Sequence, residues 1–148
     1  MARFIFKMQN VLTVKEKLES QAKTAYGLAA AKLHLEEERL ATIIGRIVER
    51  EGWLAEELTT SLEVVKIREL QDGIDVLKFK KMEQEFAVEA AKEELEKAQE
   101  ALNLAMQERK IYEKLKENAF EEFKKELAAE EQKEVDELVS FRFGNGGI

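Results

Sequence analysis

The single histidine is the side chain best suited to binding a metal ion. His34 precedes Glu37 and Glu38 at spacings of three and four residues, which places the three side chains on one face of a helix. An imidazole and two carboxylates could bind a metal in that arrangement. A di-iron site in a helical bundle, however, requires Glu-x-x-His motifs on two helices, and one histidine cannot supply both. We therefore interpret the group as a solvated helical face and predict no metal site.

Phosphate binding and catalysis have still less support. The glycines at positions 27, 45, 52 and 73 stand alone within helical sequence, so no glycine-rich loop can surround a phosphate. Cysteine is absent, which excludes disulfides and thiolate metal sites. An enzyme also needs a pocket with converging polar groups, and a pair of long helices offers none. We predict a non-enzymatic protein with no catalytic residue and no cofactor.

Two features could contact a protein partner. Trp53 follows Gly52 near the expected chain reversal, where it would either cover the top of a hairpin or anchor a partner, and the sequence favours neither. Residues 108–116, E-R-K-I-Y-E-K-L-K, form a basic-rich run on an acidic chain. Ion pairs between residues four apart would explain this run as the flank of a coiled coil, which we favour over a patch for an acidic protein surface.

The composition is typical of long helices rather than of a globular core. Proline is absent, and charged residues make up 37 % of the 148 residues against 7 % for aromatic residues. Alanine, glutamate, lysine and leucine predominate, as in coiled coils. The net charge of −7 argues against nucleic acid as the main partner, because phosphate binding requires clustered positive charge. No apolar stretch approaches the length of a membrane span. The apolar run at the start of the sequence is also too short for a signal peptide.

A seven-residue repeat runs through the second half of the chain. Its apolar members are Ile67, Leu70, Ile74, Leu77, Val88, Ala91, Leu95, Ala98, Leu102, Ala105, Tyr112, Ala119 and Phe123. Polar residues fill the same register at Lys81, Gln84, Arg109, Lys116 and Glu126. A sustained heptad with charged flanks predicts a coiled coil, in which these residues form the seam.

The first half shows the same spacing with a slip of one residue. Apolar residues follow one register at Met8, Val11, Leu18, Ala22, Ala25 and Ala29. They then continue out of step at Leu33, Leu40, Ile44, Ile47, Leu54 and Leu58. Such a slip predicts a stutter, which locally relaxes the supercoil.

Two places could reverse the chain. Residues 58–63, L-T-T-S-L-E, hold the only cluster of two threonines and a serine, and Thr60 with Glu63 has the spacing of a capping box. The rival is Gly73, although one glycine costs a helix only about 1 kcal/mol relative to alanine, which a long packed helix can absorb. We choose the first place, which puts apolar residues of the two helices opposite each other. The second also gives plausible layers.

These patterns predict an all-α fold in which two long helices form an antiparallel coiled-coil hairpin. We expect a single domain over residues 1–148, with helix one at about 6–58, a turn at about 59–62, helix two at about 63–142 and a frayed tail at 143–148. Helix two then runs past the start of helix one. The apolar residues left without a partner in this overhang would be Leu127, Val135, Leu138 and Phe141.

Three segments resemble the FliJ family of flagellar export proteins. Residues 4–12, F-I-F-K-M-Q-N-V-L, look like the F-x-F-x-x-Q-x-x-L opening of the family, and residues 131–137, E-Q-K-E-V-D-E, are similar to its E-x-K-x-x-D-E ending. Residues 67–77 stand where the family begins its second helix, with Leu70 and Gly73 at places where members often carry aromatic residues. The order of the segments and the chain length match over nearly the whole sequence.

The resemblance implies a bacterial cytoplasmic protein at the inner-membrane face near the flagellar base, peripheral to the membrane through protein contacts. It implies a coiled coil similar to the stalk subunit of rotary ATPases, with the flagellar export ATPase, the membrane-embedded export gate and export chaperones as partners. The residues expected to meet the ATPase ring are Phe4, Phe6, Gln9, Leu12, Arg109, Lys110, Lys114, Lys133, Asp136 and Glu137. Those expected to meet the export gate are Leu70, Gly73 and Leu77. The alternatives are a structural homodimeric coiled coil and a general holdase chaperone.

Overall fold

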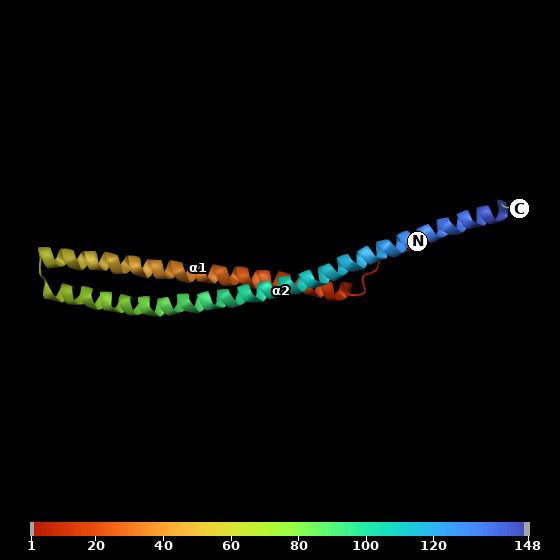
Figure 1. The fold of residues 1–148 in the computed structure, drawn as a ribbon. Coiled ribbons are helices and arrows are strands. Elements are labelled where there is room, and N and C mark those ends of the chain that lie inside the picture. The colour runs from red at the N-terminus through yellow and green to blue at the C-terminus, as the bar shows by residue number, and fades with distance from the viewer. Residues whose placement is uncertain (1, 147–148) are drawn as a thin grey trace. The chain divides into compact units, whose positions relative to one another are not determined.

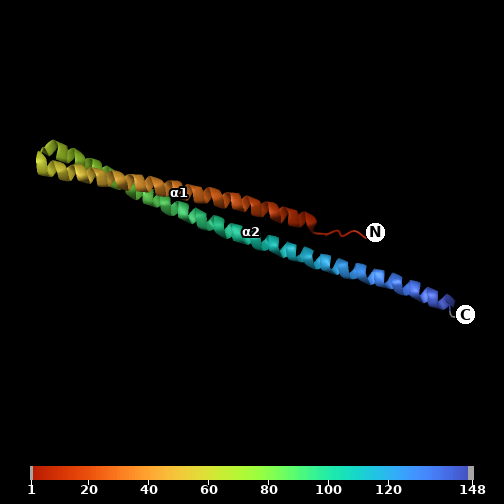
Figure 2. The same cartoon turned by 90° about the horizontal axis from the view of Figure 1, so that it is seen from above.

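The computed structural model describes residues 2–146, and within them the chain forms two helices and no strand. Helix α1 spans Gln9–Thr60 and helix α2 spans Val64–Gly146, joined by a short connection (Figure 1). The two helices run antiparallel and pack against each other, as Figures 1 and 2 show. The predicted all-α helical hairpin is therefore confirmed.

Contacts divide the chain into two compact units. Unit 1 combines residues 2–20 with 104–146, and unit 2 comprises residues 21–103. Each unit contains a stretch of α1 and an antiparallel stretch of α2. Lys15 thus meets Glu108 within unit 1, and Glu36 meets Gln84 within unit 2. The chain reversal belongs to unit 2.

The chain reverses at residues 61–63. The amides of Ser61 and Leu62 donate to the carbonyl oxygen of Glu57 at 3.3 and 3.1 Å, which satisfies an acceptor that the end of α1 would leave free. Leu62 has a φ of +48°, in the left-handed region that favours glycine. A leucine therefore holds the one strained backbone position of this turn.

The threonines before the reversal close α1 rather than open α2. The hydroxyls of Thr59 and Thr60 donate to the main-chain oxygen of Glu56 at 2.9 and 2.8 Å. The expected capping box between Thr60 and Glu63 does not form, because Thr60 is the last residue of α1 and α2 begins only at Val64, so Thr60 does not stand at the N-cap position of α2. Gly73 lies inside α2, so the rival reversal point is not used.

Both helices differ from their expected bounds at the ends away from the turn. Helix α1 begins at Gln9 rather than near residue 6, and residues 2–6 have no regular structure. An extended segment advances farther per residue than a helix, and Phe4 uses that reach to pack on α2. Helix α2 continues to Gly146, so residues 143–146 are helical where a frayed tail was expected. Residues 147 and 148 lie outside the described part of the chain.

The seam of α2 follows the predicted register. Every member from Ile67 to Phe123 is buried or half-buried, including the polar ones. Ile74, Val88 and Ala91 form the most enclosed part, at 6 % exposure or less. Glu126 is exposed, so the seam ends one position earlier than expected.

The seam of α1 has no stutter, contrary to the prediction. Burial follows one unbroken heptad, formed by Leu12, Lys15, Glu19, Ala22, Tyr26, Ala29, Leu33, Glu36, Leu40, Ile43, Ile47, Arg50, Leu54 and Glu57. Five of these residues are charged, whereas the apolar Leu18, Ile44 and Leu58 are each more than 40 % exposed. Half of the predicted apolar members do lie in this seam, namely Ala22, Ala29, Leu33, Leu40, Ile47 and Leu54. The apolar pattern missed the alternate seam positions, because charged side chains with hydrogen-bonding partners occupy several of them.

Candidate partner-binding surfaces

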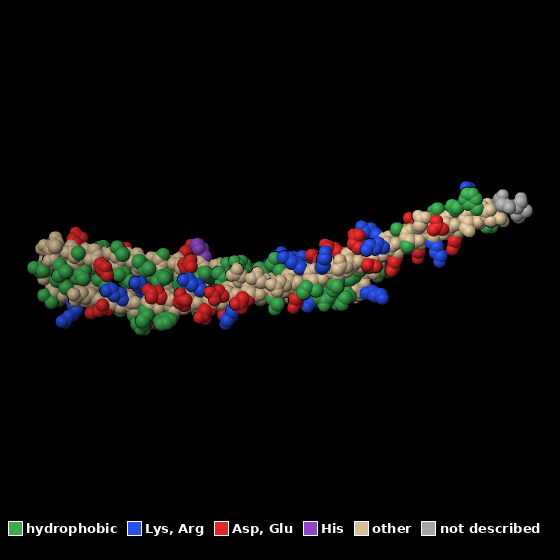
Figure 3. All heavy atoms as spheres, viewed as in Figure 1, with side chains coloured by type: hydrophobic (Ala, Val, Ile, Leu, Met, Phe, Trp, Pro, Cys, Tyr) green, Lys and Arg blue, Asp and Glu red, His purple; other side chains and the backbone are tan. Residues whose placement is uncertain are grey.

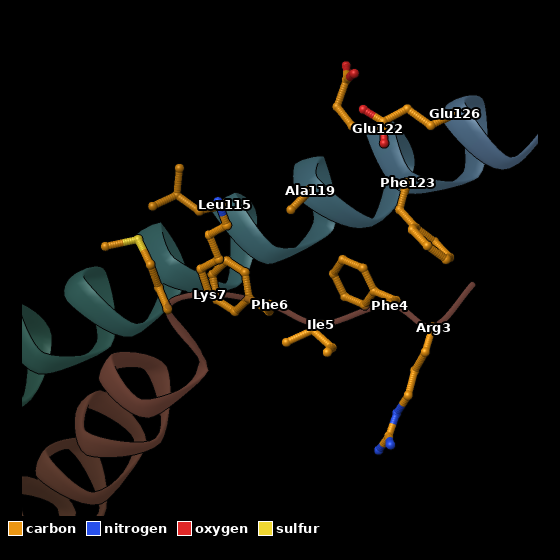
Figure 4. Close-up of a pocket in the computed structure, with 11 residues that line it drawn as sticks. Arg3, Phe4, Ile5, Phe6, Lys7, Leu115, Ala119, Glu122, Phe123 and Glu126 are labelled. Atoms are coloured by element: carbon orange, nitrogen blue, oxygen red, sulfur yellow. The ribbon is translucent and has the colours of Figure 1, made fainter. Parts of the chain in front are cut away.

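In unit 1, three aromatic rings pack together and hold the N-terminal segment, residues 2–6, against α2. The ring centroid of Phe4 lies 5.1 Å from that of Phe120, edge to face, and 5.5 Å from that of Phe123. Such aromatic pairs contribute about 0.5–1.5 kcal/mol beyond their burial. Figure 4 shows the segment passing alongside α2, with Phe4 turned toward the helix and Arg3 pointing away from it.

Two open grooves flank Phe4. The larger, of about 540 Å³, has apolar walls that include Leu115 and Phe123, and Glu122 and Glu126 stand at its edge (Figure 4). The smaller has a volume of about 470 Å³ and is lined by Phe4, Leu12, Phe120, Lys116 and the carboxylates of Glu16, Glu113 and Glu117. Each groove could hold an apolar side chain of a partner.

Charged residues in the seam of unit 1 pair with one another. Arg109 donates to the carboxylates of Glu19 and Glu113, the latter at 2.6 Å, and Lys15 donates to Glu108 at 2.9 Å. The hydrogen bonds to Glu113 and then Glu19 raise the pKa of Arg109, and the bond to Glu108 is the main reason that the pKa of Lys15 is raised. Both cations are therefore charged near neutral pH and engaged within unit 1.

The residues expected to meet the ATPase ring divide into packed and exposed groups. Phe4, Phe6 and Gln9 are half-buried, and Leu12 is 2 % exposed, so these side chains hold unit 1 together. Arg109 belongs with them because its guanidinium is held in the seam by two carboxylates. These five residues are not freely available to a partner.

The remaining expected residues form an exposed set of mixed charge, made up of Lys110, Lys114, Lys133, Asp136 and Glu137. Their contacts within the chain are slight. The ammonium of Lys114 lies 3.5 Å from the carboxylate of Glu117, three residues later on the same helix, and Asp136 accepts a hydrogen bond from Gln132 at 3.0 Å. Surface pairs of this kind contribute little to stability, which leaves the charges available for a partner.

Comparisons with known proteins decide the family. The family described as "Flagellar FliJ protein" matches residues 4–147. The chain belongs to the FliJ family. It is therefore a component of a flagellar or type III protein export system. None of the helices in residues 2–146 has the length and apolar character needed to cross a membrane.

A solved structure shares the fold of this FliJ-family chain. A putative YscO homolog from Chlamydia trachomatis superposes with a TM-score of 0.65 at 24 % identity, covering 99 % of this chain and 98 % of the other. At that identity the likeness shows a common fold alone. The comparison with curated proteins gave no match.

The positions that the FliJ resemblance assigns to the export gate face the seam of unit 2. Leu70 and Leu77 are half-buried seam residues, and Gly73 adjoins the buried Ile74. A shallow hollow of about 280 Å³ opens beside them and is lined by Arg50, Lys66, Glu69, Leu70 and Gly73. A methyl group at Gly73 would meet nothing within 4 Å, so the hollow is open above the glycine.

Trp53 and His34 both lie at the surface of unit 2. The indole of Trp53 is 45 % exposed, and the guanidinium of Arg50 lies 4.7 Å from its ring centroid as a cation–π pair. His34 Nε2 lies 2.9 Å from the carboxylate of Glu38, and both side chains are largely exposed. Within residues 2–146 no three side chains gather as potential metal ligands.

Sequence reasoning missed an apolar stripe on the outer face of α2 in unit 2. Val76, Phe79, Met82 and Phe86, which we call the outer stripe, are between 48 and 70 % exposed. Their spacing of three or four residues places them along one side of the helix. Figure 3 shows hydrophobic side chains projecting from α2 on this part of the surface. The signal was present in the sequence as a second set of apolar residues out of register with the seam.

The C-terminal part of α2 carries a second exposed apolar run. Residues 128–144 are all exposed, and Val135, Leu138 and Val139, which we call the C-terminal stripe, lie on one side of the helix at 45–65 % exposure. Leu127, expected to be exposed, is half-buried. Phe141 is 69 % exposed, in agreement with the expected overhang.

Proposed function

We propose that this FliJ-family chain is a non-enzymatic, stalk-like part of the flagellar export apparatus and that it binds the export ATPase ring through unit 1. The observation that carries the proposal is the exposure of every residue from 128 to 144 of α2. A helical stretch without a packing partner is marginally stable in water, and a protein that covers it would add the missing stabilisation.

The surface of unit 1 has the chemistry of a binding site rather than of a catalytic one. Lys110 and Lys114 are exposed on α2 near the two grooves beside Phe4, and Lys133 and Asp136 follow on the uncovered stretch. Charges at the rim of an interface mainly set the encounter rate and the orientation of the partner. The apolar walls of the grooves would supply about 25 cal/mol for each Å² removed from water.

The proposal extends to contacts with the export gate and with export chaperones at the cytoplasmic face of the inner membrane, near the flagellar base. Its support is the family to which the chain belongs. Leu70 and Leu77 pack in the seam, so we propose that a gate contact at this level uses the hollow above Gly73. The cationic side chains of Arg50 and Lys66 line that hollow and could orient a partner carboxylate.

The test of ATPase binding is the double variant Lys110→Glu with Lys114→Glu. Both residues are exposed, unlike Arg109, whose replacement by Glu would bring three carboxylates together in the seam. We expect weaker capture of the purified export ATPase and weaker stimulation of its ATP hydrolysis, with a difference from the unmodified protein that shrinks as salt rises.

The matched control is Lys92→Glu with Lys97→Glu, which makes the same charge change at exposed positions of unit 2. It should bind the ATPase as the unmodified protein does, and circular dichroism should show both double variants fully helical. Undiminished ATPase binding by the folded Lys110/Lys114 variant at low salt would remove this face from the interface.

The two alternatives have less support. A homodimer built through the seam is disfavoured because the two helices of one chain already fill the seam in each unit. A general holdase would suppress aggregation of unrelated unfolded proteins, whereas we expect no such activity from surfaces suited to a structured partner. Light scattering of a heat-unfolded reporter protein, with and without the chain, distinguishes a general holdase from the proposed stalk-like protein.

A further inference from the structure

We infer that residues 2–6, which we call the strap, cover a partner-binding face of α2, and that an aromatic side chain of the partner takes the place of Phe4 there. The covered face and its opening follow from unit 1 alone, whereas the export ATPase as the partner rests on the proposed function. The strap holds the face closed in the free chain and gives way when a partner competes for it.

Side chains alone hold the strap against α2. Within residues 2–146 the main chain of residues 2–5 forms no hydrogen bond, and the carbonyl oxygen of Phe6 accepts one only from the amide of Gln9, at 3.1 Å, in the turn before α1. Phe4 and Phe6 are half-buried, whereas Ile5 is 74 % exposed. A segment with few buried contacts and no main-chain hydrogen bonds to its neighbour opens at a lower free-energy cost than the packed helices do.

The apolar face of α2 is wider than the strap that lies on it. Leu115 and Phe120 each remain 42 % exposed, although Phe4 packs on the ring of Phe120. The grooves of about 540 and 470 Å³ flank Phe4, and Phe4 lines both of them. Withdrawal of this one ring therefore joins the two grooves into a single apolar trough, bounded on α2 by Leu115 and Phe123 (Figure 4).

Phe4 itself shows which chemistry the trough accepts. Its ring centroid lies 5.1 Å from that of Phe120 and 5.5 Å from that of Phe123, distances at which aromatic rings attract each other. The segment that carries the ring is not helical, so a single aromatic side chain on an extended segment is enough to fill the trough. Basic and acidic side chains both line the two grooves, so the fit of the ring selects the occupant and charge does not.

The trough leads into the uncovered stretch of α2. Phe123 lies about one and a half helical turns before residue 128, and every residue from 128 to 144 is exposed. A partner that covers this stretch and extends its contact along α2 therefore meets the strap next and has to displace Phe4. The apparent affinity for such a partner is lowered by the fraction of chains in which the strap is open, so loss of Phe4 strengthens binding.

Thiol labelling of the full chain measures the opening of the strap without any partner. The sequence has no cysteine, so Ala119→Cys places a single thiol in the larger groove, where position 119 is half-buried. Addition of Phe4→Ser should raise the labelling rate about tenfold, because two aromatic pairs are lost. The control Ser140→Cys, at an exposed position, should react equally fast with and without Phe4→Ser. An unchanged rate at position 119 would mean that the strap does not cover this face, which overturns the inference.

A peptide with the sequence of the strap tests what the trough accepts. The probe is the synthetic peptide A-R-F-I-F-K, residues 2–7, and shifts of the backbone amide NMR signals report its binding. The full chain with Phe4→Ser should bind the peptide, with the largest shifts at Ala119, Phe120 and Phe123. The unmodified chain should bind it about tenfold more weakly, because its own strap occupies the trough. The control peptide A-R-S-I-F-K should not bind. A Phe4→Ser chain that does not bind A-R-F-I-F-K, or equal binding by both chains, overturns the inference.

Capture of the purified export ATPase tests the partner, with circular dichroism to confirm that each variant is helical. Phe4→Ser should strengthen capture by the factor by which it raises the labelling rate, since both report the open fraction. The matched control Ile5→Ser, on the exposed side of the strap, should change nothing, and Phe120→Ser added to Phe4→Ser should cancel the gain.

Two outcomes of the capture experiment have different meanings. Weaker capture by Phe4→Ser would make the strap part of the interface and would overturn its role as a competitor. Failure of both the unmodified and the Phe4→Ser chain to capture the ATPase would instead contradict the proposed ATPase contact. The labelling and peptide experiments would then decide by themselves whether the strap covers a site for an aromatic side chain.

Discussion

At the scale of single residues, charged and polar side chains occupy positions where a coiled coil usually places apolar ones. In unit 2 the amide of Gln84 donates to the main-chain oxygen of Glu36 at 2.9 Å and also to its carboxylate. Glu36 is only 8 % exposed, so its charge depends on such partners. A polar layer of this kind lowers stability relative to apolar packing, but it fixes the register in which the two helices meet.

Replacing Gln84 by Leu tests the importance of this layer. The substitution removes one of the two side-chain donors to the buried carboxylate of Glu36 and leaves only Arg39, which donates at 3.0 Å, so we expect the free energy of unfolding to fall by about 0.5–1.5 kcal/mol. The matched control is Gln71→Leu at an exposed position of α2, which should change it by less than about 0.5 kcal/mol. Urea denaturation followed by circular dichroism measures both, and equal effects would show that the Gln84 bond contributes nothing.

At the scale of the helices, the register of α1 decides which of two neighbouring apolar residues supports the fold. Ile47 is 7 % exposed in the seam, whereas Ile44, one turn earlier, is 41 % exposed. The unbroken heptad therefore predicts a large difference between identical substitutions at the two sites. A register with a stutter would make both isoleucines seam residues.

We expect Ile47→Asp to lower the free energy of unfolding by more than about 3 kcal/mol, because it buries a carboxylate with no partner and removes apolar contacts. Ile44→Asp should cost less than about 1 kcal/mol, since the new carboxylate remains in contact with water. Thermal and urea unfolding of the two variants side by side provide the measurement. Comparable losses at both positions would argue for the stutter.

The turn between the helices provides a stabilising substitution. Leu62 has a φ of +48° and is 64 % exposed, so its side chain gains little from packing while its backbone is strained. Leu62→Gly should raise the free energy of unfolding by about 0.5–1 kcal/mol by relieving that strain, even though glycine has more freedom in the unfolded chain. Thr59→Gly, inside the last turn of α1, should lower it by about 1 kcal/mol. A loss of stability at position 62 would mean that the strain is absent.

At the scale of the whole molecule, the chain keeps much more surface in water than a globular protein does. Its accessible surface is 11,644 Å², whereas a globular chain of 17.1 kDa exposes about 7,800 Å². No large side chain is fully enclosed among the described residues. Stability must therefore come from many thin layers along the seam, and surface remains available for partners.

The denaturant dependence of unfolding should reflect this small buried area. Since the m-value scales with the surface exposed on unfolding, we expect a urea m-value about three quarters of that of a compact protein of equal length. Urea titrations followed by circular dichroism measure it. A value equal to that of a globular protein of this size would mean that the helices bury more surface than the structure shows.

The sequence by itself determined the architecture of this protein. The absence of proline and the strict heptad around Ile74 and Val88 are local properties of the chain, and they were enough to predict two long helices and the reversal near Thr60. The resemblance of residues 4–12 to the FliJ opening was likewise readable without coordinates. Tertiary structure alone decided the register of α1 and the state of the ends. Glu19 lies in the seam because Arg109 on the other helix pairs with it. Residues 2–6 stay extended because the rings of Phe120 and Phe123 hold Phe4 against α2. Such pairings join residues far apart in the chain, and a local pattern of apolar spacing does not register them.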